Sequence, residues 1–428
     1  NKQVVHNALK MGLATQSHIN RRNIFARKNY FYADLPKGYQ ISQFELPICE
    51  HGFLEIPSEG GVKKIGITRI HMEEDAGKSI HDEAFVSKNE TLVDLNRCGV
   101  PLIEIVSEPD LRGAAEAAAY VSKMRQLVRY LGICDGNMEE GSLRCDANVS
   151  LRPFGEKKLG TKTELKNMNS IKNVEKAINY EIKRQADILD DGGEIIQQTL
   201  LWDPDKNEAR AMRGKEDAHD YRYFPDPDLV EVYIDEKWLD EARKELPELP
   251  DKRRQRFMDE LGLPAYDAEI LTASRDVADY FEQTLAVSGN PKKTSNWVMG
   301  EILRLSKEHN LPAGALSITP ARLGELILAV EEGEISQSAA KTVFEALVKE
   351  DAPVAQMIEK LGLKQISDQG ALEKIIDRII AENPKEAESY RNGKTKLLGF
   401  FMGNVMRASQ GKADPQKVST LLREKLSS

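Results

Sequence analysis

The spacing of apolar and polar residues divides the chain into two parts near residue 235. Before this point, short strand-like runs are separated by Gly, Pro, Asn and Asp. In the clearest run, 142–152, apolar residues such as Leu143 alternate with polar residues such as Arg144. This pattern is typical of a strand with one face on a core and the other on water or a polar cavity. Further strands are predicted over 64–73, 101–106 and 229–234. We therefore predict an α+β fold with a mainly antiparallel sheet.

Elsewhere in the chain the apolar residues recur at the spacing of a helix. Two helices are predicted among the strands, over 114–131 and 170–189, and Ser170 is a candidate N-cap of the second. From residue 236 onwards almost every segment has a helical pattern, interrupted by short Gly or Pro breaks. The helices predicted there cover 236–246, 251–261, 265–285, 293–309, 319–332, 336–349, 353–361, 370–382, 384–391, 395–409 and 415–427.

Three consecutive acids, Glu73, Glu74 and Asp75, end the predicted strand 64–73, and Lys78 follows them. Adjacent carboxylates repel each other, and at a half-buried site they are tolerated when a cation lies among them. A lysine beside such a site can receive phosphate oxygens. The segment therefore suggests Mg²⁺-nucleotide chemistry, and the alternative is a solvated acidic turn. Neighbouring residues of a strand face opposite sides, so we expect Glu73 to point away from Glu74.

Two further carboxylates lie in predicted strands. Glu104 interrupts the apolar run 101–106, where a lone carboxylate is costly unless it is paired or bound to a metal. Asp146 shares the polar face of its strand with Arg144. If the strands are neighbours, carboxylates from the run Glu73–Asp75, from Glu104 and from Asp146 converge as Mg²⁺ ligands, and Arg144 contacts a phosphate beside the metal. The alternative for Glu104 is a salt bridge to a neighbouring arginine.

Basic residues suggest contacts to a nucleotide or to RNA. Lys166 precedes the predicted helix 170–189 and is a candidate to line the site. The segment 27–32, Arg-Lys-Asn-Tyr-Phe-Tyr, mixes cations with aromatic rings, which suits a nucleotide or RNA, although an edge strand explains it equally well. No P-loop, HExxH or GxSxG motif occurs, so ATP would have to bind on a sheet.

Composition narrows the possibilities further. A length of 428 residues suggests roughly three domains. Four scattered cysteines, without a CxxC pair, suit a reducing cytoplasm. A net charge of −9 argues against a protein that coats nucleic acid. Residues 391–428, however, carry eight Lys or Arg and two acids, which leaves +6. Such a basic end suggests a local contact with RNA phosphate, and the alternative is a merely soluble helical tail.

Several strings of residues together resemble one family, the aspartyl/glutamyl-tRNA(Asn/Gln) amidotransferase B subunits, and the similarity runs along essentially the whole chain. The strings are Arg-Lys-Asn-Tyr-Phe-Tyr (27–32), Arg-Ile-His-Met-Glu-Glu-Asp-Ala-Gly-Lys (69–78), Val-Asp-Leu-Asn-Arg (93–97), Pro-Leu-Ile-Glu-Ile-Val-Ser-Glu-Pro-Asp (101–110), Met-Glu-Glu-Gly-Ser-Leu-Arg-Cys-Asp-Ala-Asn (138–148), Thr-Glu-Leu-Lys-Asn-Met-Asn-Ser (163–170) and Leu-Gly-Leu-Pro-Ala-Tyr-Asp-Ala (261–268).

The resemblance implies three domains. Residues 1–245 would form a catalytic cradle on an antiparallel sheet, similar to glutamine synthetase and guanidino kinases. Residues 246–362 would form an all-α helical domain, and 363–428 a small YqeY-like tail that contacts tRNA. Candidate RNA-binding residues in the tail are Lys394, Lys396, Arg407 and Lys412.

The resemblance also implies an activity. The family phosphorylates the side-chain carboxylate of Glu-tRNA(Gln) or Asp-tRNA(Asn) with ATP and Mg²⁺. Ammonia, channelled from the amidase or A subunit, then displaces the phosphate, and a small C subunit completes a heterotrimer. The metal ligands carry over onto Glu74, Glu104 and Asp146, with Lys78, Arg144 and Lys166 as phosphate contacts.

One departure from the family pattern concerns the start of the chain. The family opens with a strand containing Gly-Leu-Glu-x-His, whose Glu and His also serve the metal, and this segment is absent here. We therefore expect the metal site of this chain to be incomplete.

Two other functions remain open on the residues alone. One is a stand-alone carboxylate-amine ligase or phosphagen-type kinase, which would not need a basic helical tail. The other is a non-catalytic RNA-binding scaffold, which has little reason to place Glu104 in an apolar strand.

Overall fold

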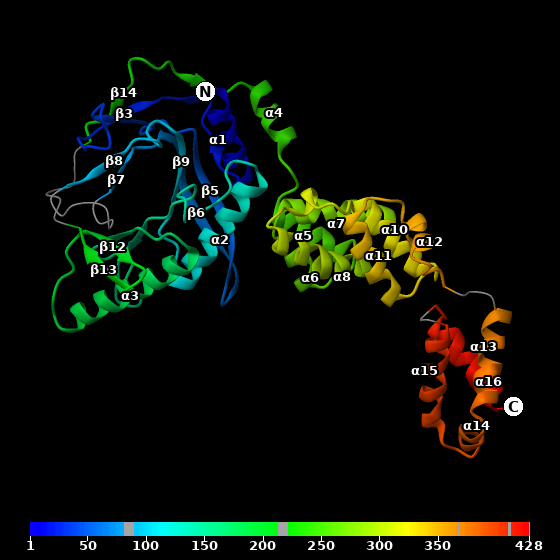
Figure 1. Ribbon diagram of the computed structural model, residues 1–428. Coiled ribbons are helices and arrows are strands. Elements are labelled where there is room, and N and C mark those ends of the chain that lie inside the picture. The colour runs from blue at the N-terminus through cyan, green and yellow to red at the C-terminus, as the bar shows by residue number, and fades with distance from the viewer. Residues whose placement is uncertain (81–89, 213–220, 366–368, 410–411, 428) are drawn as a thin grey trace. The chain divides into compact units, whose positions relative to one another are not determined.

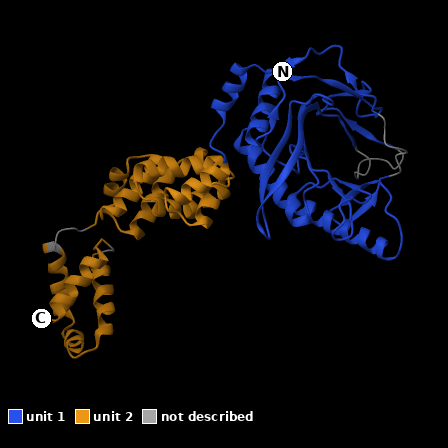
Figure 2. Ribbon diagram, turned by 180° about the vertical axis from the view of Figure 1, so that it is seen from behind, with its two compact units in different colours: residues 1–249 blue, residues 250–428 orange. Residues whose placement is uncertain are grey.

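The computed structural model divides the chain into two units, residues 1–249 and 250–428 (Figure 2). It describes residues 1–80, 90–212, 221–365, 369–409 and 412–427. The first unit holds the strands, and the second consists of helices (Figure 1). None of the helices in the described ranges combines the length and the apolar character that a bilayer crossing requires.

The largest sheet of unit 1 has the strand order β1-β5-β6-β9 and is antiparallel throughout. Helices α1 (Lys2–Ala14) and α2 (Ala114–Tyr130) contribute to the core on one of its faces, together with buried residues such as Ile70 and Met72. The strands are β1 (His18–Ile19), β5 (Cys49–Ser58), β6 (Gly61–Glu74) and β9 (Pro101–Ser107).

A kink reverses the alternation of buried residues along β6. Ile65 and Ile67 are buried before it, whereas Ile70 and Met72 are buried after it. The register between β6 and β9 shifts between Ile67 and Arg69, which is the signature of a β-bulge. Beyond the bulge the even-numbered residues face the helices, so the odd-numbered ones face the opposite side.

A second sheet, with the order β10-β11-β12-β13, is covered by helix α3 (Ile171–Asp190). Ser170 caps this helix as predicted, because its hydroxyl accepts a hydrogen bond from Asn173 N at 3.2 Å. Leu165 packs into the core below α3, so Glu164 and Lys166 on the same strand face away from it. The strands are β10 (Ala147–Val149), β11 (Thr163–Lys166), β12 (Thr199–Asp203) and β13 (Glu208–Ala211).

Smaller sheets complete unit 1. In Figure 1 the sheet β14-β3-β4 and the sheet around β12 and β13 lie at opposite ends of the largest sheet. The remaining elements are β2 (Arg22–Asn23), β3 (Ala26–Asn29), β4 (Tyr39–Ser42), β7 (Lys78–Ile80), β8 (Leu92–Asp94), β14 (Phe224–Pro225), β15 (Val232–Tyr233) and α4 (Glu236–Glu245).

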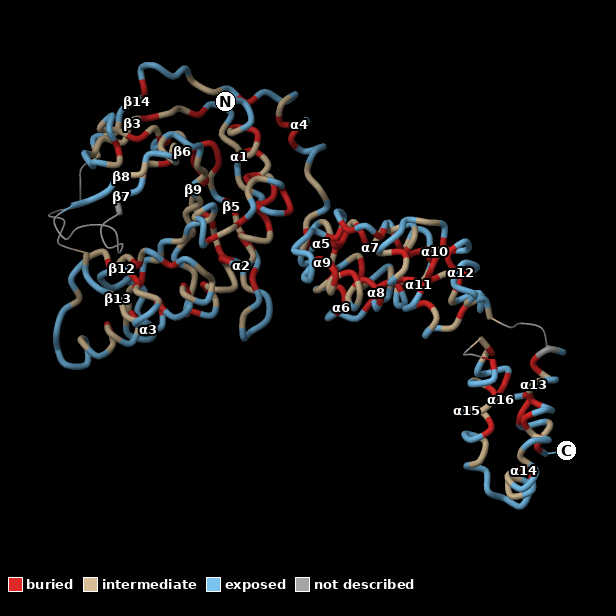
Figure 3. Tube along the Cα trace, viewed as in Figure 1, coloured by how far each residue is buried: buried red, intermediate tan, exposed pale blue. Residues whose placement is uncertain are grey.

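The described residues of unit 2 form two separate hydrophobic clusters, one built from residues 257–358 and one from residues 372–426. Figure 3 shows the buried stripes of their helices. The helices are α5 (Pro250–Asp259), α6 (Ala265–Leu271), α7 (Arg275–Ser288), α8 (Pro291–Trp297), α9 (Leu303–His309), α10 (Pro320–Glu331), α11 (Gln337–Lys349), α12 (Val354–Lys360), α13 (Gln369–Glu382), α14 (Pro384–Arg391), α15 (Leu398–Ala408) and α16 (Pro415–Ser427).

The predicted mixture of helices and strands, with a helical second half, is confirmed. The details differ in places. The predicted strand 142–152 is reduced to β10, and Arg144, which lies before β10, pairs with Asp75. The predicted helix 265–285 is two helices, α6 and α7, and a π-helical turn, Val298–Ile302, separates α8 from α9.

Candidate active site

The register between β6 and β9 decides which carboxylates share a face. His71 lies opposite Glu104, and Glu73 lies opposite Leu102. Residues opposite each other in an antiparallel pair point to the same side. His71, Glu73 and Glu104 therefore lie on the face of the sheet that α1 and α2 do not cover.

In this structure Glu74 does not share a face of β6 with Glu104. Glu74 lies opposite Pro101, in phase with Met72, and so belongs to the other face of β6. Glu73, which was predicted to point away, joins Glu104 instead. The physical reason is the bulge near Thr68, whose effect on strand phase cannot be read from the spacing of the residues.

His71, Glu73 and Glu104 form a compact group. His71 Nε2 lies 3.2 Å from Glu73 Oε1 and 3.9 Å from Glu104 Oε2. Among the described residues, this is the group whose ligand atoms, all within 4.8 Å of one another, could hold a metal ion. Asp146 lies outside the group. The sequence offered one signal for His71, namely its spacing of two residues from Glu73.

Hydrogen bonds keep the buried Glu73 carboxylate ionised. Burial raises the pKa of Glu73, but the hydrogen bond with His71 and the charge of Lys28 outweigh it, so the pKa lies below its ordinary value. Ser42 Oγ donates to Glu73 Oε1 at 2.6 Å, and Gln40 Nε2 donates to Oε2 at 3.1 Å. The site thus contains a buried negative charge that a cation would stabilise.

Glu74 is held at the junction of β6 with β4. Its carboxylate accepts a hydrogen bond from Ile41 N at 2.8 Å and pairs with Lys37. The side chain is only 14% exposed. Lys78, the predicted phosphate contact, is exposed on the short strand β7.

Asp75 joins two loops at the end of β6. Its carboxylate lies 2.7 Å from Arg97 Nη2 and 2.9 Å from Arg144 Nη2. Since Arg144 is two residues before Asp146, this contact brings the loop with the predicted ligand Asp146 towards the acidic end of β6.

Asp146 and Lys166 form an ion pair of 2.5 Å, and Lys166 Nζ also lies 3.1 Å from Glu164. Burial lowers the pKa of Lys166, but the charges of Asp146 and Glu164 outweigh it, so the pKa lies above its ordinary value and the lysine stays charged. The carboxylate of Asp146 is 48% exposed and therefore open to a ligand.

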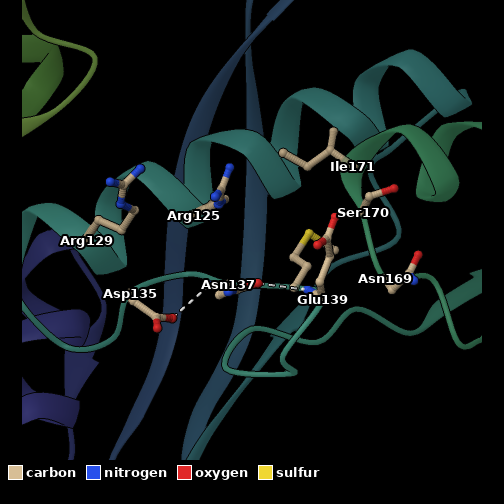
Figure 4. A pocket seen from close by; sticks show the side chains of 9 residues that line it. Arg125, Arg129, Asp135, Asn137, Glu139, Asn169, Ser170 and Ile171 are labelled. Atoms are coloured by element: carbon tan, nitrogen blue, oxygen red, sulfur yellow. Dashed lines mark hydrogen bonds between the residues drawn. The ribbon is translucent and has the colours of Figure 1, made fainter. Parts of the chain in front are cut away.

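A pocket of about 510 Å³ lies between α2 and the start of α3 (Figure 4). Arg125 and Arg129 of α2 line it, together with Asp135, Glu139 and Ser170. Two positive and two negative side chains balance in its lining. None of the predicted ligand or phosphate-contacting residues lines this pocket.

The predicted RNA-binding residues of the tail lie in and beside α15. Lys394, Lys396 and Arg407 are exposed, and Lys412 is half-buried. Arg407 also lines a pocket of about 520 Å³ together with Arg378 and Phe400.

Comparison with known proteins gives two family matches. The model of the GatB/GatE catalytic domain matches residues 1–240, and the model of the GatB domain matches residues 279–426. Curated relatives are named as the B subunit of aspartyl/glutamyl-tRNA(Asn/Gln) amidotransferase. The protein from Chlorobium phaeobacteroides (strain BS1) is 56% identical, that from Pelodictyon phaeoclathratiforme 58% and that from Geotalea uraniireducens 57%. Each match spans 426 residues, which is 100% of this chain and 89% of the relative.

Proposed function

The chain belongs to the family of aspartyl/glutamyl-tRNA(Asn/Gln) amidotransferase B subunits, and we propose that unit 1 carries out the ATP-dependent step of that enzyme. The enzyme is a ligase that forms a carbon–nitrogen bond with glutamine as amido donor. Its substrates are Glu-tRNA(Gln), Asp-tRNA(Asn) or both. The identity of 56% to 58% over the whole chain carries this conclusion.

The chemistry requires activation of a poor electrophile. A carboxylate oxygen of the aminoacyl side chain attacks the γ-phosphorus of ATP, and ADP leaves. Ammonia then attacks the carbonyl carbon of the acyl phosphate, phosphate leaves with the carbon–oxygen bond electrons, and the nitrogen loses a proton to give the amide. Acyl phosphates hydrolyse readily, so the site must exclude water.

Mg²⁺ would offset the charge that develops on the transferred phosphoryl group. Glu73 and Glu104 fit this ion because Mg²⁺ prefers carboxylate oxygens. The ionised state of the buried Glu73 supports the assignment. His71 would orient the Glu73 carboxylate through the contact at its Nε2.

Glu74 and Asp146 remain proposed ligands for a different reason. Each is paired with a lysine, Glu74 with Lys37 and Asp146 with Lys166. Glu74 lies on the other face of β6 from Glu104, and Asp146 lies outside the acidic group, so both assignments rest on the family membership alone. Arg144 and Lys78 would complete the cationic side of the site.

The larger organisation is proposed from the same membership. Residues 1–245 would form a cradle similar to glutamine synthetase, 246–362 a helical domain and 363–428 a YqeY-like tail that contacts tRNA. The partners would be the amidase or A subunit, as the source of ammonia, and the small C subunit.

The proposal is tested with the assembled enzyme, ATP, glutamine and Glu-tRNA(Gln). Gln-tRNA should form, and both ATP and tRNA should be required. Amidation of free glutamate without tRNA would point to a stand-alone ligase. Binding of tRNA without any turnover would point to a scaffold. Either result would contradict the proposal.

A further inference from the structure

A half-buried arginine, Arg69, lies on β6 shortly before the acidic group. Ile70 and Met72 follow it beyond the bulge and pack into the core that α1 and α2 share with the sheet. Neighbouring residues of a strand face opposite sides. Arg69 therefore belongs to the open face of β6, together with His71 and Glu73.

The pKa of the Tyr223 hydroxyl indicates which charges lie near one another on this face. Burial, and then the charge of Glu73, raise the pKa of Tyr223 to about 12. The positive charge of Arg69 lowers the same pKa, and the charge of Glu104 adds to the rise. A single hydroxyl is thus within the range of the arginine and of both carboxylates, which places Arg69 beside the acidic group.

The guanidinium of Arg69 has no anionic partner in the part of the chain that the structure describes. Glu50 lies opposite it on β5, where a cross-strand pair of opposite charges could form. The Glu50 carboxylate, however, accepts a hydrogen bond from Asn20 Nδ2 at 2.8 Å, and none of the ion pairs between described residues joins it to Arg69. A half-buried charge without a partner is costly, so this guanidinium is suited to an anion that the enzyme binds.

Two of the other cations proposed for the site differ from Arg69 in this respect. Arg144 pairs with Asp75 at 2.9 Å, and Lys166 pairs with Asp146 at 2.5 Å. Each must give up part of an ion pair before it can receive a phosphate oxygen, whereas Arg69 need not. Its planar guanidinium can also donate two parallel hydrogen bonds to the oxygens of one phosphoryl group.

We propose that Arg69 is a catalytic residue that binds the γ-phosphoryl group of ATP before and during its transfer. This inference rests on the proposed function. During transfer the bond between the γ-phosphorus and the bridging oxygen breaks, ADP leaves with the electron pair, and a bond forms to an oxygen of the substrate carboxylate. Negative charge stays on the three outer oxygens throughout. Arg69 offsets this charge without exchanging a proton, because a guanidinium stays protonated.

The test measures nucleotide binding to the assembled enzyme in the presence of Mg²⁺, for the wild type and for Arg69→Met. The ligands are ADP and an ATP analogue in which an NH group replaces the oxygen between the β- and γ-phosphorus. Loss of the guanidinium should raise the Kd of the analogue by about 10-fold or more, because hydrogen bonds between charged groups are strong. The Kd of ADP should stay the same, which also shows that the variant is folded.

Two further variants serve as controls. Arg69→Lys keeps a positive charge but not the planar guanidinium, so it should weaken binding of the analogue less than Arg69→Met does. Lys64→Met removes an exposed cation of the same strand, nearer its start. This variant should bind both nucleotides like the wild type.

Two outcomes would overturn the inference. Equal weakening of ADP and of the analogue in Arg69→Met would show that the residue supports the site as a whole and does not recognise the γ-phosphoryl group. Unchanged binding of both nucleotides would show that Arg69 does not contact this group. Since the measurement involves no turnover, an enzyme that binds both nucleotides but fails to amidate would contradict the proposed function without deciding this result.

Discussion

His71 Nε2 lies 3.2 Å from Glu73 Oε1, and both side chains are buried on the face of β6 that also carries Glu104. An ionised carboxylate in such a place is costly unless it has partners. The partners of the Glu73 carboxylate are His71 and two side chains of β4, Gln40 and Ser42. Glu104, which also contacts His71, is 47% exposed. The arrangement leaves one side of the group accessible to a cation.

We expect Glu73→Gln and Glu104→Gln to weaken Mg²⁺ binding, so that amidation requires a higher Mg²⁺ concentration. Each change keeps the shape of the side chain but removes a negative ligand. The Mg²⁺ concentration for half-maximal turnover should rise by about 10- to 100-fold. Glu55→Gln, at an exposed position on β5 of the same sheet, is the control. An unchanged Mg²⁺ titration in both variants would contradict the role of the group.

Lys166→Met should raise the KM for ATP more than it lowers kcat. The change removes the cation beside Asp146 while keeping much of the apolar stem. Because Lys166 would bind a phosphate oxygen before and during transfer, its loss should cost roughly 1.5–3 kcal/mol of nucleotide binding. Steady-state kinetics with varied ATP and saturating tRNA measure the effect. Lys172→Met, an exposed lysine on α3, should behave like the wild type, and an equal rise in both variants would argue against a specific contact.

The strand that ends in the three acids could be predicted from the apolar residues before them, but its phase could not. Ile65 and Ile67 alone suggest that odd-numbered residues face the core, which would bury Glu73 against the helices. The bulge beyond Ile67 reverses this order, and β5 carries a matching irregularity at His51, whose φ is +56°. Such a paired irregularity depends on contacts between strands, which the spacing along one strand does not contain.

The sequence also did not predict which residues of neighbouring strands lie opposite each other. The sequence indicated that Glu104 needed a partner, but only the register of β9 against β6 identifies His71 and Glu73 as its neighbours. The helices of the second half were easier to predict, because their periodicity is local. Their breaks, such as the one between α6 and α7, were less evident since no Gly or Pro lies at 272–274.

We expect unit 1 to become less stable in acid, because protonation of Glu181 removes a stabilising charge. It is fully buried in α3, where Thr163 Oγ1 and Arg184 donate to its carboxylate. Burial raises the pKa of Glu181, but these hydrogen bonds outweigh it and the pKa is lowered. Because the pKa is lower in the folded protein, the ionised carboxylate stabilises the fold at pH values above the pKa of the unfolded chain, about 4.3. This contribution is lost as the pH falls through the pKa of the folded state.

Glu181→Gln should therefore reduce the opening free energy of α3 by about 2 kcal/mol at pH 7. The difference from the wild type should shrink as the pH falls below about 4.3, because protonation there first favours the unfolded chain, and the difference is lost once the folded carboxyl is protonated too. Native-state hydrogen exchange of α3 measures the opening free energy at each pH. Glu175→Gln, on the exposed side of the same helix, is the control, and a difference independent of pH would show that packing rather than charge is responsible.

The tail should bind tRNA through its charge. If Lys394, Lys396 and Arg407 each contact a phosphate, the triple change to Gln should lower the slope of log Kd against log salt by about 2 to 3, because each contact releases nearly one counterion. Filter binding of tRNA at several salt concentrations, with the assembled enzyme, measures the slope. The control changes Lys252, Lys307 and Lys341, three exposed lysines of unit 2, to Gln. Equal slopes for the two triple variants would contradict a specific role of the tail cations. The KM for ATP should stay the same in both, since the proposed nucleotide contacts all lie in unit 1.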